Sequence, residues 1–398
     1  MRHPVLEKIR NRFDRCGILL IVCWILVRIT VVAQADDRAA DQKTIDTSGF
    51  SDSAAHWRNL RDSARFLQPR PDHPAWEPHQ SEQIAENILL FQRDNGGWPK
   101  DYDMRAVLND TERSQVVGTR SRNDTSFDNH NIFSQVEYLA RIYRRTLNPR
   151  YRESCERGLD FMLSAQYPSG GIPQKYPLTK GYRAHITFND GVMIGVLRTL
   201  KNAAERASHF DWLDDVRRDR AAVAVARGVD CILKCQILVD GKRTGWCQQH
   251  DETTFDPTSA RSFELASICP QDTTEIVLFL KSIEPASEVI SHSIDAAVSW
   301  LRTVVLQGIR LEKVAAPKLD YLRHTADFDV IVVSDPAAPP LWARHYEIGT
   351  NRPIFAGRDG IKRYRFSEME RERRTGTSWY GGWPQSLLDQ LDQEQPDH

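Results

Sequence analysis

One phrase recurs along the chain and restricts what it can fold into: an amphipathic helical stretch, a glutamine, then a turn rich in glycine. The stretches are residues 84–92, 158–166 and 228–236, which end at Gln92, Gln166 and Gln236. A second helical stretch follows each of the first two phrases, at residues 131–146 and 191–206, with apolar residues on one face. A helix pair that repeats in this way must bury its apolar face against neighbouring pairs.

The repeat predicts an all-α fold, either an (α/α) toroid or a partially closed α/α barrel, built from about three helix-pair repeats. Residues 273–281 and 288–304 form a further predicted pair. A linear solenoid is the structural alternative. The mixed pattern after Gln307, with its apolar run at 330–333, predicts minor strands and long rim loops. Because helices in a toroid alternate in direction, the loops after the glutamine phrases should share one rim.

The N-terminus has the pattern of a secretory signal. Basic residues within positions 1–15 precede an apolar run at 17–27, and Ala33-Gln34-Ala35 matches a small-x-small cleavage site. We therefore expect a signal peptide at residues 1–35, export to the periplasm or the exterior, a disordered polar leader at 36–56 and one folded domain at 57–390. An uncleaved anchor is the alternative, although the apolar run is short for a bilayer span.

Charge and cysteine content exclude some classes of protein. The chain carries 53 Lys+Arg against 54 Asp+Glu, a net charge of -1. This balance argues against a nucleic-acid or membrane-surface binder that acts through bulk electrostatics, so we expect no nucleic acid, no stable membrane partner and a monomer. The cysteines left after signal removal are odd in number, so buried thiols are expected. A single disulfide between Cys247 and Cys269 is the alternative.

Two related triplets stand just before predicted helices. They are Phe127-Asp128-Asn129 and Phe188-Asn189-Asp190. Aspartate is a common helix N-cap, so capping is the alternative interpretation for either residue. Two such triplets at equivalent places in a repeat instead indicate hard oxygen ligands for Ca²⁺, with water and a substrate carboxylate completing the shell.

Aromatic and basic residues gather in the same predicted rim loops. The aromatic residues Trp98, Trp246, Trp342 and Tyr346 suit stacking against sugar rings, with core packing as the alternative. The basic residues Lys100, Arg261, Arg344 and Arg352 are either solvated surface charges or partners of uronate carboxylates. The run at residues 371–374 is interpreted as an exposed helix face.

These phrases resemble the family 10 polysaccharide lyases, the pectate lyases of the α/α-toroid type. The matching motifs are residues 92–100, 127–129, 166–168, 185–191, 246–251, 260–265 and 335–355. They cover nearly the whole chain after the leader. The resemblance implies cleavage of polygalacturonate (α-1,4-linked galacturonate) by Ca²⁺-assisted β-elimination, which gives unsaturated oligogalacturonates.

The resemblance also implies roles for individual residues. Asp128 and Asp190 would bind Ca²⁺, with Asn129 assisting, and Asp128 and Arg261 would be catalytic. Arg261 would be the base that removes the proton next to the substrate carboxylate. The substrate-binding residues would be Lys100, Asn129, Trp246, His250, Arg344, Tyr346 and Arg352. Because guanidinium ordinarily stays protonated, the base role requires nearby cations to lower the pKa of Arg261. Alternatively, Arg261 stabilises charge while another base acts.

Two segments depart from the family pattern. His130-Asn131 stands where the family tends to have small residues, and residues 266–272 lack its Pro-Ser and Ser-Gly pattern. The alternatives to a lyase are an α/α-toroid glycoside hydrolase, which would use paired carboxylates, and a non-catalytic acidic-polysaccharide-binding protein. The Arg and Lys residues at the motif positions favour the lyase, because a uronate cleft requires cations.

Overall fold

The computed structural model describes residues 44–70 and 72–394. The chain divides into two compact units, residues 1–45 and 46–398, and the elements below all belong to the second unit. The predicted signal peptide at 1–35 lies outside the described residues, as does the first part of the predicted leader. In the part of the chain that is described, none of the helices is both long enough and apolar enough to cross a membrane.

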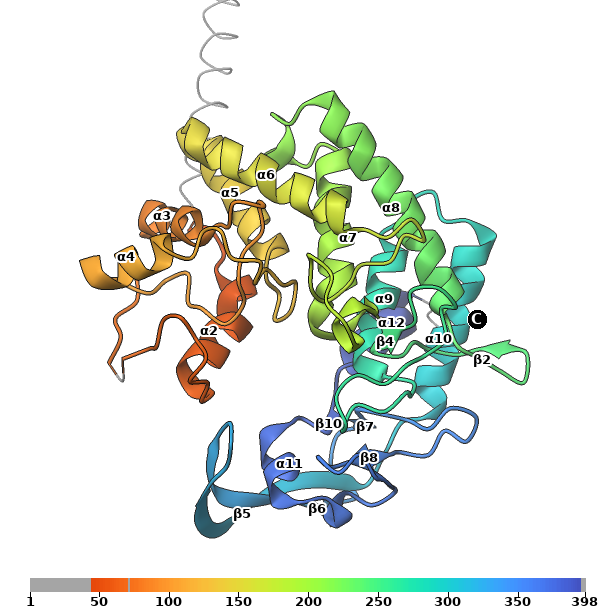
Figure 1. The fold of residues 1–398 in the computed structure, drawn as a ribbon. Helices are drawn as coiled ribbons and strands as arrows, with labels where there is room; N and C mark the ends of the chain where they lie inside the picture. The colour runs from red at the N-terminus through yellow and green to blue at the C-terminus, as the bar shows by residue number, and fades with distance from the viewer. Residues whose placement is uncertain (1–43, 71, 395–398) are drawn as a thin grey trace, which may run out of the picture. The chain divides into compact units, whose positions relative to one another are not determined.

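The helices and strands are short to medium in length (Figure 1). The α-helices are α2 (Ser51–Asn59), α3 (Ser81–Phe91), α4 (Asp110–Val117), α5 (Phe133–Thr146), α6 (Pro149–Ala165), α7 (Val192–Ala204), α8 (Asp215–Cys235), α9 (Pro270–Lys281), α10 (Glu288–Thr303), α11 (Arg371–Gly376) and α12 (Gln385–Glu394). The 3-10 turns are η1 (Ser48–Phe50), η2 (Tyr182–Ala184), η3 (Asn189–Gly191), η4 (Ser208–Phe210) and η5 (Phe366–Glu368). The strands are β1 (Ile186–Thr187), β2 (Leu238–Val239), β3 (Lys242–Arg243), β4 (Gln249–His250), β5 (Ile309–Asp320), β6 (Thr325–Ser334), β7 (Trp342–Ala343), β8 (Phe355–Ala356), β9 (Lys362–Arg363) and β10 (Tyr380–Gly381).

The helices pack as successive pairs. α5 packs against α6, α7 against α8, and α9 against α10. One layer is continuous from α5 through α7 to α9, and a second runs from α3 through α6 to α8. Burial of apolar helix faces stabilises these layers. On α5, for example, Val136, Leu139 and Ala140 are fully buried. The prediction of a helix-rich α/α fold is confirmed, whereas closure of a toroid and the number of repeats remain predictions.

The three repeat glutamines make the same contacts in the folded chain. Each is the C-cap of its helix, and its side-chain Nε2 donates to two backbone carbonyls, one in the following turn and one on the next helix of the second layer. The acceptors are Gly96 and Ser154 for Gln92, Gly170 and Ala224 for Gln166, and Thr244 and Ser293 for Gln236. The glutamines therefore join each repeat unit to the next.

The repeat tryptophans also have a structural role. The indole Nε1 of Trp98 donates to Ile88 on α3, that of Trp246 to Ile232 on α8, and that of Trp342 to Leu301 on α10. All three rings are almost completely buried. Core packing, the alternative to sugar stacking, therefore describes these three tryptophans.

The segment after α10 is built differently from the helical layers. β5 and β6 form a long antiparallel hairpin in which Glu312 pairs with Ile331. A small core beside it consists of Phe355, Phe366, Met369 and Trp379, and Val330, Val332 and Tyr380 pack against it. All sheets of the described chain are two-stranded, in agreement with the predicted minor strands.

Two local expectations differ from the structure. Part of the predicted disordered leader folds, since α2 begins at Ser51 and Trp57 on it is buried. The indole Nε1 of Trp57 donates to the Leu67 carbonyl, which is one of the contacts that anchor this polar segment. The predicted exposed face at residues 371–374 is also wrong, because Arg373 is buried and pairs with Glu372.

Candidate active site

The two aspartate triplets occupy equivalent positions in the fold. Phe127 N donates to Gln174 O in the next rim loop, and Phe188 N donates to Gln248 O in the loop after that, both at 2.9 Å. Each backbone bond ties a triplet to the following repeat. The antiparallel pairing of β1 with β4 also joins two of these loops. The repeat thus brings Asp128 and Asp190 to the same end of the α5–α7–α9 layer.

Neither aspartate caps its helix. Helices α6, α8 and α10 begin at polar caps, since Asn148, Asp214 and Ser287 accept hydrogen bonds from their backbone amides. By contrast, α5 and α7 start at Ile132 and Gly191 without a side-chain cap bond from any described residue. The capping alternative is therefore wrong. Both carboxylates remain available for other partners.

Asp128 is buried among groups that favour its charged form. The Lys100 ammonium contacts its Oδ2, and Gln174 Nε2 donates to its Oδ1 at 3.0 Å. Burial opposes ionisation, but the charge of Lys100 and hydrogen bonds from Asp190 and Lys100 hold the pKa of Asp128 well below its usual value. Lys100 also lies 3.6 Å from Asp101. Although burial favours its neutral form, these carboxylates raise the pKa of Lys100.

Asp190 has the opposite electrostatic character. Burial, followed by the neighbouring negative charge of Asp128, raises the pKa of Asp190 far above that of a free carboxyl. Asn189 Nδ2 donates to its Oδ2 at 2.9 Å. The raised pKa favours the protonated form of Asp190 beside the charged form of Asp128, which limits the repulsion between like charges.

This donor set fits a calcium ion. Ca²⁺ prefers carboxylate oxygens, and Asp128 and Asp190 bring such atoms to one place. A divalent cation can take over the charge compensation that a proton on Asp190 otherwise provides. Asp128 and Asp190 are the residues that would hold it.

Arg261 lies close to the two aspartates and pairs with Glu264. Its Nε donates to Glu264 Oε2 at 2.6 Å, and its Nη2 contacts Oε1. Burial would lower the pKa of Arg261, but the Glu264 hydrogen bonds and the charges of Glu264, Asp190 and Asp128 raise it above the ordinary value. The expected lowering is therefore absent in this arrangement of the described residues. Glu264 lies in the motif at residues 260–265, but the sequence pattern predicted no role for it at the site.

The remaining cations lie in different surroundings. Arg344 Nη2 donates to Asn189 Oδ1 at 3.2 Å, and its charge acts on Asp190, so it borders the aspartate pair. Arg352 is exposed, and its guanidinium carbon lies 3.7 Å from the ring centroid of Tyr364. Lys100 and Arg344 thus accompany the carboxylates, as expected, whereas Arg352 stacks on an exposed tyrosine.

Four expected substrate contacts are buried instead. Trp246 and His250 have no exposed surface, and Tyr346 is 1% exposed with its hydroxyl donating to Val304 O at 2.6 Å. Burial lowers the pKa of His250 to about 4. Asn129 is also buried, and its amide donates to Asp101 Oδ1 at 2.8 Å. Side chains with so little exposed surface offer little contact to a sugar ring, and the substrate-binding role of these four residues stays a prediction.

Sequence reasoning missed several members of the site. Asp101 follows Lys100 directly, and Gln174 lies one residue after the Gly-Gly-Ile-Pro turn, so their places in the repeat were the available signal. His56 carries no such signal, because it lies in the segment expected to be disordered. Its imidazole Nδ1 lies 2.8 Å from Asn129 Nδ2.

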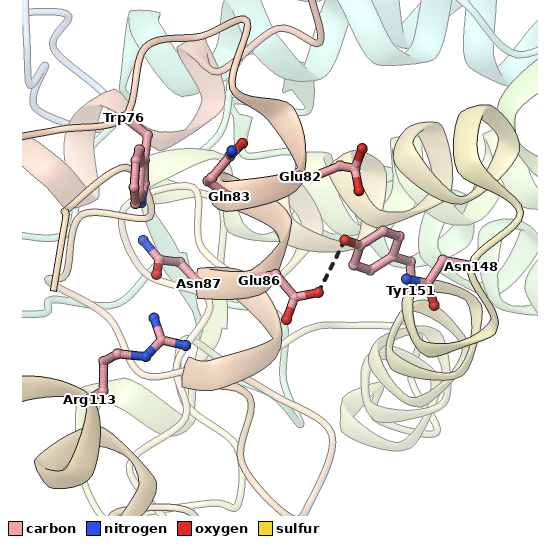
Figure 2. Close-up of a pocket in the computed structure, with 8 residues that line it drawn as sticks. All are labelled: Trp76, Glu82, Gln83, Glu86, Asn87, Arg113, Asn148 and Tyr151. Carbon is pink, nitrogen blue, oxygen red and sulfur yellow. Dashed lines mark hydrogen bonds between the residues drawn. The ribbon is translucent and has the colours of Figure 1, made fainter. Parts of the chain in front are cut away.

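Two other features, a group of three polar residues and a cavity, include neither Asp128 nor Asp190. His185, Asp251 and Glu252 bring their ligand atoms within 4.8 Å of one another. A cavity of about 320 Å³ is lined by Trp76, Glu82, Gln83, Glu86, Asn87, Arg113, Asn148 and Tyr151. Figure 2 shows the Tyr151 hydroxyl directed at Glu86, and it donates to Oε1 at 3.1 Å. None of the predicted site residues lines this cavity.

Comparisons with known proteins agree on one family. Residues 92–388 match the family model described as pectic acid lyase. A solved structure of a family 10 polysaccharide lyase from Cellvibrio cellulosa is similar to this chain, with 30% identity, a TM-score of 0.66, and coverage of 78% of this chain and 91% of that one.

An aspartate-to-alanine mutant of a family 10 polysaccharide lyase from the same organism, solved in complex with trigalacturonic acid, gives similar values. The identity is 31%, the TM-score is 0.68, and the match covers 79% of this chain and 92% of that one. No curated protein sequence matches the chain.

Proposed function

This chain belongs to the pectic acid lyase family, and from that premise we propose that it cleaves polygalacturonate by Ca²⁺-assisted β-elimination. Its identification as a polysaccharide lyase follows from the family model and the solved relatives. The observation that carries the finer proposal is the convergence of Asp128 and Asp190, with Arg261, Lys100 and Arg344 acting on the pair.

The substrate proposal rests on charge. A polymer of uronates carries one carboxylate per sugar, and the charges of Lys100, Arg261 and Arg344 act on one or both of the aspartates. The similar lyase from Cellvibrio cellulosa was solved with trigalacturonic acid, which is a short form of this polymer. A neutral polysaccharide has no carboxylates that could pair with these cations.

The reaction requires removal of the proton on the carbon next to the uronate carboxylate. As that C–H bond breaks, its electrons form a double bond to the neighbouring carbon, and the glycosidic oxygen on that carbon departs and takes up a proton. Bound Ca²⁺ would neutralise the substrate carboxylate and so acidify this C–H bond. Asp128 and Asp190 would hold the Ca²⁺, while Lys100 and Arg344 would stabilise the negative charge that develops on the sugar acid.

Arg261 is the proposed proton acceptor because it is half-exposed and lies beside both aspartates. In the pair with Glu264 it is protonated, since Glu264, Asp190 and Asp128 all raise its pKa. Neutralising the two aspartates with a cation removes part of that effect. Turnover should therefore increase toward alkaline pH, where a larger fraction of Arg261 is deprotonated.

The direct test is an ultraviolet assay with polygalacturonate at alkaline pH, with Ca²⁺ or with a chelator. The proposal expects a Ca²⁺-dependent rise in absorbance from unsaturated uronates, which disappears in Arg261→Ala and Asp128→Ala. New reducing ends without that absorbance would indicate a hydrolase. Binding of the polymer with neither product would indicate a non-catalytic binder.

We further propose export of the protein and a monomeric state. Export rests on the basic, apolar and small-x-small order of residues 1–35. Fractionation of producing cells, together with N-terminal sequencing, tests it, and a mature chain that begins after Ala35 is the expected result. Light scattering of the purified protein tests the monomer.

A further inference from the structure

Helix α2 lies outside the residues that match the family model, yet it is anchored in the folded unit. Phe50, just before α2, packs on Tyr138 with 5.5 Å between ring centroids. On the helix, Ser53 Oγ accepts from Tyr102 N at 3.3 Å, and Trp57 is buried. These anchors fix α2 against α5 and the Lys100 loop.

One face of α2 reaches the turn that follows Asp128. Asp52 and His56 are four residues apart, so their side chains project from the same side of the helix. Asp52 Oδ2 lies 2.7 Å from His130 Nδ1, and His56 Nδ1 lies 2.8 Å from Asn129 Nδ2. Asp101 completes the network by accepting from the same Asn129 amide.

The turn contacted by α2 has an unfavourable backbone conformation. Asn129 and His130 have φ of 57°, and Ile132 has φ of 74°. For residues with a side chain, each left-handed conformation costs about 1–2 kcal/mol. Such a turn persists only where its surroundings hold it. The side chains of Asn129 and His130 are held by His56 and Asp52.

The same turn reaches the second aspartate. A side-chain carbon on Gly191, the residue after Asp190, would lie 3.2 Å from His130 Cδ2 and Nε2. The His130 ring therefore packs on the backbone beside Asp190 while Asp52 holds its other side. His130 and Asn131 are the residues that depart from the family pattern in this segment.

We propose that Asp52 and His56 are positioning residues, which hold the Asn129–His130 turn so that Asp128 and Asp190 face one ligand. We call the contacts of Asp52 with His130 and of His56 with Asn129 the clamp. Its kinetic consequence rests on the proposed lyase function, but its effect on the turn can be measured without that function. Neither residue touches substrate in this role. Both act through the turn that carries Asp128.

The test compares substitutions of similar size that keep or remove the hydrogen bond. His56→Gln can still accept from Asn129, whereas His56→Leu cannot. Asp52→Asn can still accept from His130, whereas Asp52→Leu cannot. Because His56 and Asp52 are 40% and 51% exposed, the leucine variants should fold. Asn59→Ala, at an exposed position near the end of the same helix, is the control.

Two measurements test whether the clamp holds the Asn129–His130 turn. The first is amide hydrogen exchange of the peptide at residues 127–133, which does not depend on activity. The second is kcat and the half-saturating Ca²⁺ concentration on polygalacturonate. For each leucine variant we expect faster exchange in that peptide and a kcat lower by about three- to tenfold, equivalent to about 0.7–1.4 kcal/mol. The half-saturating Ca²⁺ concentration should rise, while the glutamine and asparagine variants stay near the parent.

The outcomes separate the two proposals. An inactive parent with faster exchange in the leucine variants overturns the lyase function and supports the clamp. An active parent whose leucine variants show unchanged exchange at residues 127–133 overturns the clamp and leaves the lyase function intact. Equal behaviour of His56→Gln and His56→Leu would reduce His56 to a packing residue and also overturn the clamp.

Discussion

Arg261 and Glu264 form a two-point ion pair, in which Arg261 Nε lies 2.6 Å from Glu264 Oε2 and Nη2 contacts Oε1. Glu264 is buried while the Arg261 side chain is 49% exposed. The pair therefore holds a proposed proton acceptor at the protein surface in its protonated form. If Arg261 is the base, removal of the Glu264 carboxylate should change the pH dependence of the reaction.

Glu264→Gln should move the pH dependence of kcat to lower pH. Burial lowers the pKa of Arg261, and Glu264 is the carboxylate that contributes most to raising it, so the substitution removes the main opposing effect. We expect the rising limb of the profile to shift down by about one pH unit, or about 1.4 kcal/mol. Asp256→Asn, which removes an exposed carboxylate from a nearby loop, should leave the profile unchanged. An identical profile for Glu264→Gln would count against Arg261 as the base.

Asp190→Asn should abolish most activity without lowering stability in the absence of calcium. The buried carboxyl has a raised pKa, so an amide of the same shape replaces a group that is costly to ionise. We expect kcat to fall by about 10²–10³-fold, the range for loss of a group that stabilises developing charge. Thermal unfolding in chelator should occur at the same temperature as in the parent or higher. A clear drop in that temperature would contradict the assignment.

Asp272 should make stability fall as pH rises through the weakly acidic range. Burial, then the charge of Glu275, raises the pKa of Asp272 to about 7. Between its ordinary value near 4 and about 7, the folded protein binds more protons than the unfolded chain, so the free energy of unfolding decreases with pH. Asp272→Asn should flatten this slope in denaturant titrations from about pH 4 to 7. Asp215→Asn, at an exposed helix start, should retain it.

Gln236→Leu should destabilise the fold more than the same substitution of a surface glutamine does. The change leaves the Thr244 and Ser293 carbonyls and the Ser293 hydroxyl without the partner they now have. Loss of these buried bonds should lower the free energy of unfolding by about 2–4 kcal/mol. Gln115→Leu on the exposed side of α4 is the control, and an equal effect of the two substitutions would contradict the linking role.

Much of the helical architecture could be predicted from the sequence. The helices at 133–146, 192–204 and 288–303 lie within a few residues of the predicted stretches, because amphipathic periodicity is a local property. α2 was missed for the converse reason. Its composition is polar, and its stability comes from Trp57 and Arg58, which contact Leu67 and Asp103 in segments that sequence reasoning did not connect to it.

The sequence by itself determined the repeat, the residue types of the site and the family, because these depend on local pattern and on the order of motifs. Only the tertiary structure decided which aromatic residues are buried, that the pKa values of Asp128 and Asp190 shift in opposite directions, and that Arg261 pairs with Glu264. Those properties depend on burial and on distances between charges from different repeats. Electrostatic interactions act through space, so the spacing of residues along the chain does not contain them.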